Sequence, residues 1–133
     1  MNLEKLIEKI KHNPEADRIG MILCHNGIVR GTARDGRRVS GLRVAVDHEK
    51  LQTVIAENLK KTGIVDILVE IAEDRDLVVG DDVMYLVVAG DIRERVIAAL
   101  TETLNAVKST VTRKQQYYTQ PGKAGTKLTI DPP

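Results

Sequence analysis

Apolar residues recur at helical spacing in three stretches of the chain. In residues 3–10, 51–59 and 96–107 they lie three or four positions apart, with charged or polar residues between them. This spacing gathers the apolar side chains on one face of an α-helix. Asn13 followed by Pro14 ends the first pattern, because proline cannot continue a helix. The pattern therefore predicts three amphipathic helices.

Capping residues indicate where the second and third helices begin. Asp47 stands just before the second helix, where its carboxylate can accept hydrogen bonds from free backbone amides. Gly63 follows this helix and suits the left-handed turn that often ends one. Asp91 and Glu94 have the spacing of an aspartate version of the capping box, which predicts that the third helix starts at Asp91.

Five other stretches favour strands or extended chain. Residues 19–30 are apolar and rich in strand-forming types, and residues 42–46 and 65–71 alternate apolar and polar positions. Residues 83–89 form a nearly continuous apolar run, which is typical of a strand buried on both faces. Residues 111–118 are predicted to be a strand or an extended segment. Together with the helices, these stretches indicate the α+β class.

A polar turn separates the first two of these strands. It spans residues 32–38 and contains an Asp-Gly pair, which is a strong short-range turn signal. We therefore predict a β-hairpin whose tip is basic and carries Arg34, Arg37 and Arg38.

Composition bounds the size and the packing of the domain. The length of 133 residues suits one domain, so residues 1–133 are predicted to form a single unit. Residues 119–133 are punctuated by Gly and Pro and are predicted to be a flexible tail. The chain has no Phe, no Trp and three Tyr, so core packing must rest on Val, Ile and Leu.

Charge and composition argue against several classes of protein. A net charge of +1 and few aromatic residues disfavour nucleic-acid binding through the basic turn. No apolar stretch approaches the roughly 20 residues that cross a bilayer, and the first residues lack the apolar run of a signal peptide. Cys24 is the only cysteine, and the three histidines lack metal-ligand spacing. We therefore expect a soluble cytoplasmic protein with no nucleic-acid or membrane partner, no metal and no cofactor.

Arginines are the first candidates for chemistry. Arg30 at the end of the first strand, together with Arg37, Arg38 and Arg34 of the turn, offers guanidinium groups that suit a phosphate or carboxylate. The alternative is that these arginines bind no ligand and only protect an edge strand from pairing with another chain. Arg93 lies at the start of the third helix, where free amides and the helix dipole favour an anion. The alternative for Arg93 is an ion pair at the surface with a neighbouring carboxylate.

Two lysines flank the junction after the third helix, Lys108 and Lys114. A partly buried lysine there would have a lowered pKa and could serve proton transfer or acyl capture. A solvated lysine at a helix C-terminus is the alternative, because cations suit that end of the helix dipole. Taken together, the arginines and lysines suggest a basic pocket for a small phosphorylated anion.

Several motifs occur in a characteristic order between residues 19 and 118. A Gly-x-Val-Arg element ends at Arg30 before the polar turn, and a Leu-x-x-Gly-Asp step ends at Asp81 before the buried strand. With the late lysines, this order resembles the catalytic (large) subunit family of molybdopterin synthase. That family carries a His-Arg pair at the start of the next helix; Arg93 keeps the arginine, and Ile92 replaces the histidine.

The resemblance implies an α/β hammerhead-like fold, with a mostly antiparallel sheet and packed helices, in a homodimer. It also implies a partner, a small ubiquitin-like sulfur-carrier subunit with a Gly-Gly C-terminus. The terminal thiocarboxylate of the carrier would donate sulfur to cyclic pyranopterin monophosphate, and two such transfers would build the dithiolene of molybdopterin. This is an enzymatic role, a sulfurtransferase of molybdenum cofactor biosynthesis.

The resemblance also assigns roles to residues. Lys108 and Lys114 are the predicted catalytic lysines; in family terms Lys108 carries catalysis and Lys114 binds the substrate. The predicted substrate-binding residues are Arg30, Arg93, Arg37 and Arg38.

The chain departs from the family pattern near these residues. His25 stands where the family usually has Phe, and Val111, Thr112 and Arg113 precede Lys114 where the family has a proline and aromatic residues. The departures leave a second hypothesis open. In it the chain is a non-catalytic paralogue, a dimeric module that binds the carrier or the pterin phosphate.

Overall fold

The computed structural model describes residues 1–119 and 127–130, a mixed α+β arrangement of helices and antiparallel sheets. The helices are α1 (Leu3–Lys11), α2 (His48–Leu59) and α3 (Arg93–Ala106), with a 3-10 turn η1 (Ala16–Arg18) and a π-helical turn η2 (Val107–Val111). The strands are β1 (Met21–Ile28), β2 (Val39–Val46), β3 (Ile64–Ile71), β4 (Leu77–Val78), β5 (Asp82–Gly90), β6 (Thr112–Thr119) and β7 (Lys127–Ile130). The three predicted helices and the five predicted strands are confirmed.

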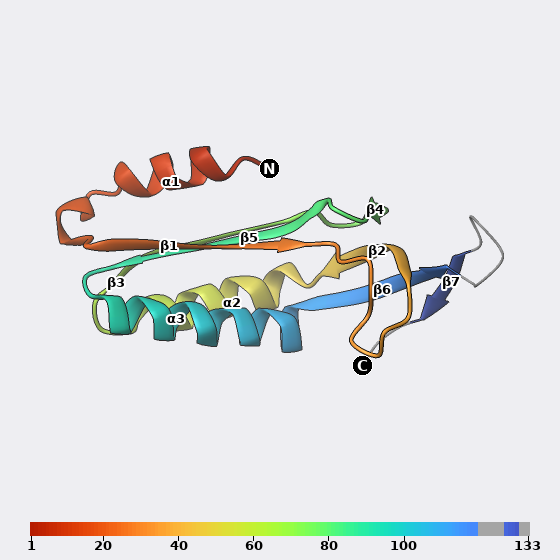
Figure 1. The fold of residues 1–133 in the computed structure, drawn as a ribbon. Helices are drawn as coiled ribbons and strands as arrows, with labels where there is room; N and C mark the ends of the chain where they lie inside the picture. Colours follow the sequence, from red (N-terminus) through yellow and green to blue (C-terminus); the bar gives the residue numbers. More distant parts are fainter. Residues whose placement is uncertain (120–126, 131–133) are drawn as a thin grey trace.

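A three-stranded antiparallel sheet in the order β1-β5-β3 forms the centre of the molecule. The central strand β5 contains Leu86, Val87 and Val88, whose side chains are fully buried. Figure 1 shows α1 on one face of this sheet and α2 and α3 on the other. Because both faces are covered, β5 needs a continuous apolar run and not an alternating one.

Successive residues of β5 contribute to cores on opposite faces of the sheet. Leu86 and Val88 pack with Val96 of α3, whereas Val87 packs with Ile10 of α1. This alternation follows from the pleat of a strand, in which neighbouring side chains point to opposite faces. Aliphatic side chains dominate both cores, as the composition predicts.

A second antiparallel sheet, in the order β4-β2-β6-β7, lies beyond the C-terminal end of α3 (Figure 1). The turn η2 connects α3 to β6. Val107 and Val111 of this turn are buried against Leu51 of α2 and Met84 of β5. These contacts fix the point where the helices and the two sheets meet.

The predicted β-hairpin is wrong, although its turn exists. β1 pairs with β5, and β2 pairs with β4 and β6, so the two strands belong to different sheets. The register of β1 shifts between Gly27 and Ile28, after which the chain crosses to the second sheet. An isolated bridge between Thr32 and Arg38 closes the turn. The central strand β5 is buried on both faces, and its burial favours pairing with β1 over a local hairpin between β1 and β2.

Of the two predicted N-caps, one is confirmed and one is wrong. The Asp47 carboxylate accepts a hydrogen bond from the Lys50 amide at 3.1 Å. The helix α3, however, begins at Arg93 with Ile92 as its N-cap and without a side-chain cap. The Asp91 amide donates to the carbonyl of Gly63, in the turn between α2 and β3, at 2.9 Å. Asp91 therefore lies one residue before the N-cap position.

The predicted tail contains a strand where it is described. Lys127–Ile130 form β7, which pairs with β6. Residues 120–126 and 131–133 lie outside the described residues. In the described part of the chain, no helix has the length and apolar character needed to cross a membrane.

Gly63 is expected to be intolerant of a side chain. Its φ is +81°, and a Cβ there would collide with the Asp91 carboxylate. Gly36 has a φ of +89° with nothing within 4 Å of a Cβ, so it serves as the matched control. We expect Gly36→Ala to lower the free energy of unfolding by about 1 kcal/mol and Gly63→Ala by about 3 kcal/mol. Urea unfolding of both variants measures this, and equal losses would contradict the predicted collision.

Candidate functional site

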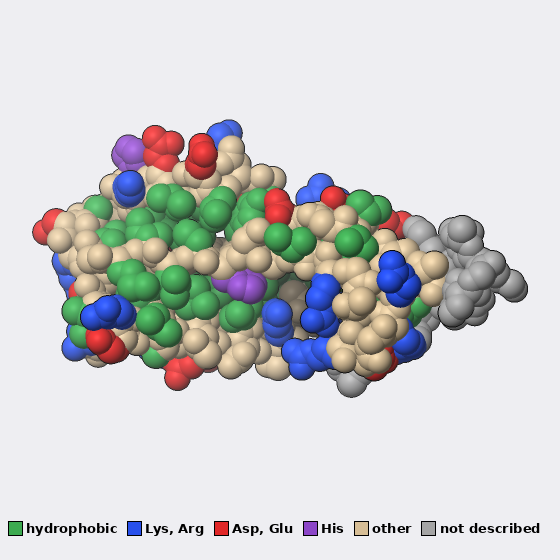
Figure 2. All heavy atoms as spheres, in the orientation of Figure 1, with side chains coloured by type: hydrophobic (Ala, Val, Ile, Leu, Met, Phe, Trp, Pro, Cys, Tyr) green, Lys and Arg blue, Asp and Glu red, His purple; other side chains and the backbone are tan. Residues whose placement is uncertain are grey.

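Four positively charged side chains meet where the two sheets join. Arg30 follows β1, Arg34 belongs to the turn between β1 and β2, Lys108 lies in η2, and Lys114 lies in β6. The charges of Lys108, Arg34 and Arg30 all act on the Lys114 amine. Figure 2 shows Lys and Arg side chains bordering a hollow on this face of the molecule. We call these four residues the cationic cluster.

The turn η2 determines where Lys108 lies. The turn starts and ends at two buried valines, Val107 and Val111, whereas the intervening Lys108 is exposed. A π-helical turn adds a residue per turn relative to an α-helix, and such turns occur frequently at functional sites. The chain then enters β6, which carries Lys114 opposite Val44 of β2. Both predicted lysines therefore reach the same junction from adjacent elements.

The turn between β1 and β2 supplies the two arginines. The Arg30 Nε donates to the Thr32 carbonyl oxygen at 2.7 Å, which holds the guanidinium against the turn. The Ala33 amide donates to the Arg37 carbonyl at 2.9 Å and shapes the loop that carries Arg34. Because this loop leads from the first sheet to the second, both arginines lie at the junction of the sheets.

The cluster has an unbalanced positive charge. Burial lowers the pKa of Lys114 below its ordinary value, and the nearby charges of Lys108, Arg34 and Arg30 lower it further. Over residues 1–119 and 127–130, none of the four cations forms an ion pair with a carboxylate. A small anion bound here would relieve the repulsion, and a lysine with a lowered pKa loses its proton more readily.

Arg37 and Arg38 share the turn but not the cluster. The Arg37 Nη2 pairs with Asp35 Oδ2 at 2.7 Å, and its guanidinium lies 4.1 Å from the centroid of the Tyr118 ring. Arg38 has an exposed side chain, and its carbonyl accepts a hydrogen bond from the Thr119 amide. Neither Arg37 nor Arg38 is among the cations whose charge lowers the pKa of Lys114. The structure therefore gives Arg37 a structural contact within the turn.

Arg93 does not join the cluster within one chain. It begins α3, whereas Lys108 follows the end of that helix, so roughly 22 Å of helix separates them at 1.5 Å per residue. The Arg93 side chain is 78% exposed and reaches Glu94 at 3.9 Å. The buried stripe of α3 runs through Val96 and Ala99 and leaves Ile97, one turn after Arg93, 46% exposed.

Two residues at this junction were not among the predicted site residues. Arg34 was counted among the arginines of the turn that suit a phosphate but was not assigned a substrate-binding role, and its charge acts on Lys114. His25 lies on β1, and burial and the charge of Lys108 both lower its pKa. Neither position is recognisable from local spacing, because each depends on where the chain crosses between sheets. In the sequence, only the group of basic residues around Gly36 pointed to Arg34.

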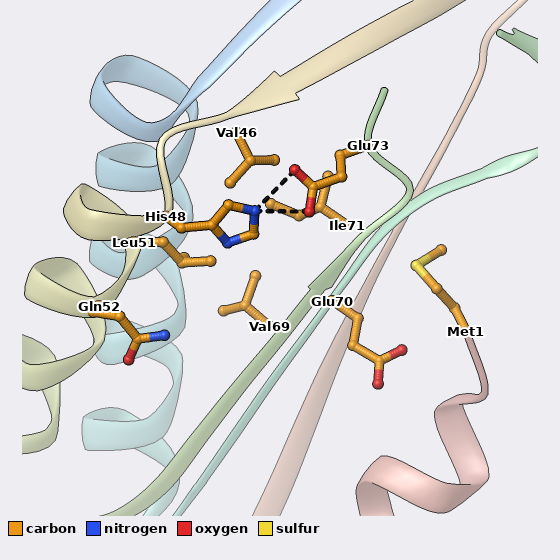
Figure 3. Close-up of a pocket in the computed structure, with 9 residues that line it drawn as sticks. All are labelled: Met1, Val46, His48, Leu51, Gln52, Val69, Glu70, Ile71 and Glu73. Carbon is orange, nitrogen blue, oxygen red and sulfur yellow. Dashed lines mark hydrogen bonds and ion pairs between the residues drawn. The ribbon is translucent and has the colours of Figure 1, made fainter. Parts of the chain in front are cut away.

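A separate cavity of about 340 Å³ lies between α2 and β3 (Figure 3). Its lining consists of Met1, Val46, His48, Leu51, Gln52, Val69, Glu70, Ile71 and Glu73. The His48 Nε2 contacts Glu73 Oε1 at 2.7 Å. Because the cavity shares no residue with the cationic cluster and its lining contains two carboxylates, it does not suit a phosphorylated anion.

The fold and the site together define a mixed α+β protein with two antiparallel sheets and a cationic cluster at their junction. The chain belongs to the MoaE family, because the family model described as MoaE protein matches residues 1–110. Comparison with curated proteins finds no match.

Several solved structures share the fold. Molybdopterin synthase from Staphylococcus aureus has a TM-score of 0.74 at 18% identity, covering 96% of this chain and 89% of that chain. The molybdopterin biosynthesis MoaE protein from Burkholderia ambifaria has a TM-score of 0.71 at 16% identity, and the match covers 98% of this chain and 83% of that chain. A chain from a complex of subunits 1 and 2 of molybdopterin-converting factor from Helicobacter pylori has a TM-score of 0.68 at 16% identity, and the match covers 98% of this chain and 84% of that chain.

Proposed function

We propose that this chain is the catalytic subunit of a molybdopterin synthase. It would transfer sulfur from the thiocarboxylate of a small carrier protein to cyclic pyranopterin monophosphate and so form the dithiolene of molybdopterin. Membership of the MoaE family supports the broader role in molybdenum cofactor biosynthesis. The observation that carries the specific proposal is the cationic cluster, whose four members have no carboxylate partner in the described chain.

The cluster suits the phosphate of the proposed substrate. Guanidinium groups bind phosphate oxygens in pairs of hydrogen bonds, a role that fits Arg30 and Arg34. Lys114 adds a third positive charge beside them. A monophosphate carries one to two negative charges near neutral pH, so its binding would offset the mutual repulsion of these side chains. The phosphate would in this way hold the pterin at the junction of the sheets.

Lys108 is the residue proposed to take part in the reaction. In each transfer the sulfur bonds to a substrate carbon while a C–O bond of that carbon breaks, and the oxygen leaves on the phosphate or, after taking up protons, as water. The bond between the sulfur and the carrier's carbonyl carbon also breaks. The carbonyl carbon then bonds to the Lys108 amine or to water, and the displaced proton leaves with the solvent. The cationic surroundings would help Lys108 to act on the acyl carbon, because positive charge stabilises the oxyanion that forms there.

The carrier is proposed to be a small ubiquitin-like protein with a Gly-Gly C-terminus. The Helicobacter pylori structure, which shares this fold, is titled as a complex of two subunits of molybdopterin-converting factor. A narrow Gly-Gly tail can reach a recessed site, because glycine lacks a side chain that would collide with the walls. Figure 2 shows a hollow bordered by Lys and Arg side chains, which is the kind of surface that such a tail could enter.

A homodimer is proposed to add Arg93 to the site. Arg93 is exposed and distant from the cluster of its own chain, so a second protomer would have to bring it there. Ile92 and Ile97 beside it are 47% and 46% exposed. Figure 2 shows hydrophobic side chains gathered over the part of the surface between α1 and α3. An apolar surface of this kind favours burial against another protein.

Reconstitution tests the proposed function. The chain is incubated with a thiocarboxylated carrier and cyclic pyranopterin monophosphate, and the dithiolene product is detected by mass spectrometry after alkylation of its sulfurs. We expect product in proportion to the carrier consumed. Binding of the carrier or of the pterin phosphate without any product would favour the non-catalytic module instead.

A further inference from the structure

His25 has an unusual environment beside the cationic cluster. On β1 it lies between Leu23 and Gly27, which occupy the same face of the strand because side chains alternate. Leu23 packs with Val96 of α3, so the His25 side chain also faces the helix layer. Its Nε2 atom is buried and has no hydrogen-bond partner among the described residues. Buried polar atoms without a partner are rare in folded proteins and call for an explanation.

The glycine two residues later leaves space on one side of the imidazole. A Cβ at Gly27 would lie 3.4 Å from His25 Nε2, with Met84 of β5 as the next neighbour. A larger residue at position 27 would fill the space next to this nitrogen. Because Gly27 has no side chain, a group from another element can approach the buried Nε2 atom from this side.

The turn η2, which carries Lys108, lies beside this part of β1, because Gly27 pairs with Met84 of β5 and Met84 packs with the two buried valines of η2. Lys108 lies between these two valines and its side chain is exposed. Burial lowers the pKa of His25, and the positive charge of Lys108 lowers it further. A neutral imidazole whose Nδ1 carries the proton has Nε2 free to accept a hydrogen bond. An ammonium group has three donors on a flexible stem. A rotation of the Lys108 side chain can therefore supply the partner that Nε2 lacks.

We propose that His25 is a positioning residue for Lys108, in which the neutral imidazole accepts a hydrogen bond at Nε2 from the lysine Nζ and directs that nitrogen into the cationic cluster. The role of Lys108 in sulfur transfer rests on the proposed function, whereas the contact between the two side chains does not. The imidazole touches no reacting atom and acts through the lysine alone.

Two NMR measurements test the contact without any catalytic assay. Lysine amines are dimethylated with ¹³C-formaldehyde, and the Lys108 methyl signal is assigned by comparison with Lys108→Met. We expect His25→Phe, which keeps a ring but removes the acceptor, to move this signal away from its wild-type position. His25→Gln, which restores an acceptor at similar reach, should return it close to the wild-type position.

The reciprocal measurement is a titration of the histidine. Two coupled groups shift each other, so Lys108→Met should raise the pKa of His25, observed through its ring C–H signals. Lys60→Met, at an exposed lysine after α2, is the control and should leave the His25 titration unchanged. An unchanged Lys108 methyl signal in His25→Phe, or unchanged His25 titration in Lys108→Met, would overturn the proposal.

The reaction provides an independent readout. In the reconstituted assay we expect His25→Phe to lower kcat with little change in the KM for the pterin phosphate, and His25→Gln to recover most of the rate. If the wild-type protein forms no dithiolene while both NMR measurements show the expected changes, the positioning contact stands and the proposed function fails. A rate in His25→Phe equal to that of the wild type would overturn the role of His25 in the reaction.

Discussion

Replacing Lys108 with alanine is expected to lower the rate of dithiolene formation by about 10²- to 10⁴-fold. The residue lies in η2, between two buried valines that fix the turn, and its own side chain is exposed. Its removal should therefore cost little stability and should act on the reaction. Single-turnover formation of the dithiolene with thiocarboxylated carrier is the measurement.

A second lysine provides the control for this variant. Lys60 follows α2, is also exposed, and lies outside the cationic cluster, so Lys60→Ala should retain the wild-type rate. Binding of cyclic pyranopterin monophosphate to Lys108→Ala should be weakened far less than the rate. An unchanged rate in Lys108→Ala would remove this lysine from the mechanism.

Two inactive variants are expected to complement each other if the homodimer completes the site. Arg93→Ala and Lys108→Ala each remove one required side chain, and these residues lie at opposite ends of α3. A heterodimer of the two single variants would contain one intact site, made from Lys108 of one protomer and Arg93 of the other. We expect it to show about half the wild-type rate per dimer. Differently tagged chains, co-expressed and purified through both tags, allow this measurement.

The matched control places both substitutions in the same chain. A heterodimer of wild type with the Arg93→Ala/Lys108→Ala double variant would contain one defect in each site, so it should be inactive. The opposite outcome, an active double-variant heterodimer and an inactive pair of single variants, would show that Arg93 acts within its own chain. Full activity of Arg93→Ala alone would show that Arg93 has no role.

Local patterns in the sequence predicted most of the elements but not their pairing. The apolar run of β5 and the helical spacing of α3 depend on neighbours in the sequence, and both were found. The strand with which β1 pairs cannot be predicted from neighbouring residues in the sequence. His25 faces Leu86, sixty-one residues later, and the choice of β5 over β2 arises from burial of the central strand. An Asp-Gly pair can specify a turn without specifying a hairpin.

The difference between local patterns and contacts between distant residues also explains which site residues were predicted. Arg30, Lys108 and Lys114 were expected together, and the structure places them at one junction with Arg34. Arg93 was expected with them, but the length of α3 separates it from the others within one chain. His25 was not proposed, because its importance depends on a buried, unpartnered nitrogen that only three-dimensional packing reveals.

Calorimetric titration of cyclic pyranopterin monophosphate tests the central claim, that the cationic cluster binds the phosphorylated substrate. Two double variants remove the same charge from the same turn. Arg30→Gln/Arg34→Gln affects the cluster, whereas Arg37→Gln/Arg38→Gln affects the arginines outside it. We predict that the first raises Kd by about 100-fold or more and that the second changes it by less than about threefold. Equal losses in the two variants, or no binding to the wild-type protein, would contradict the account.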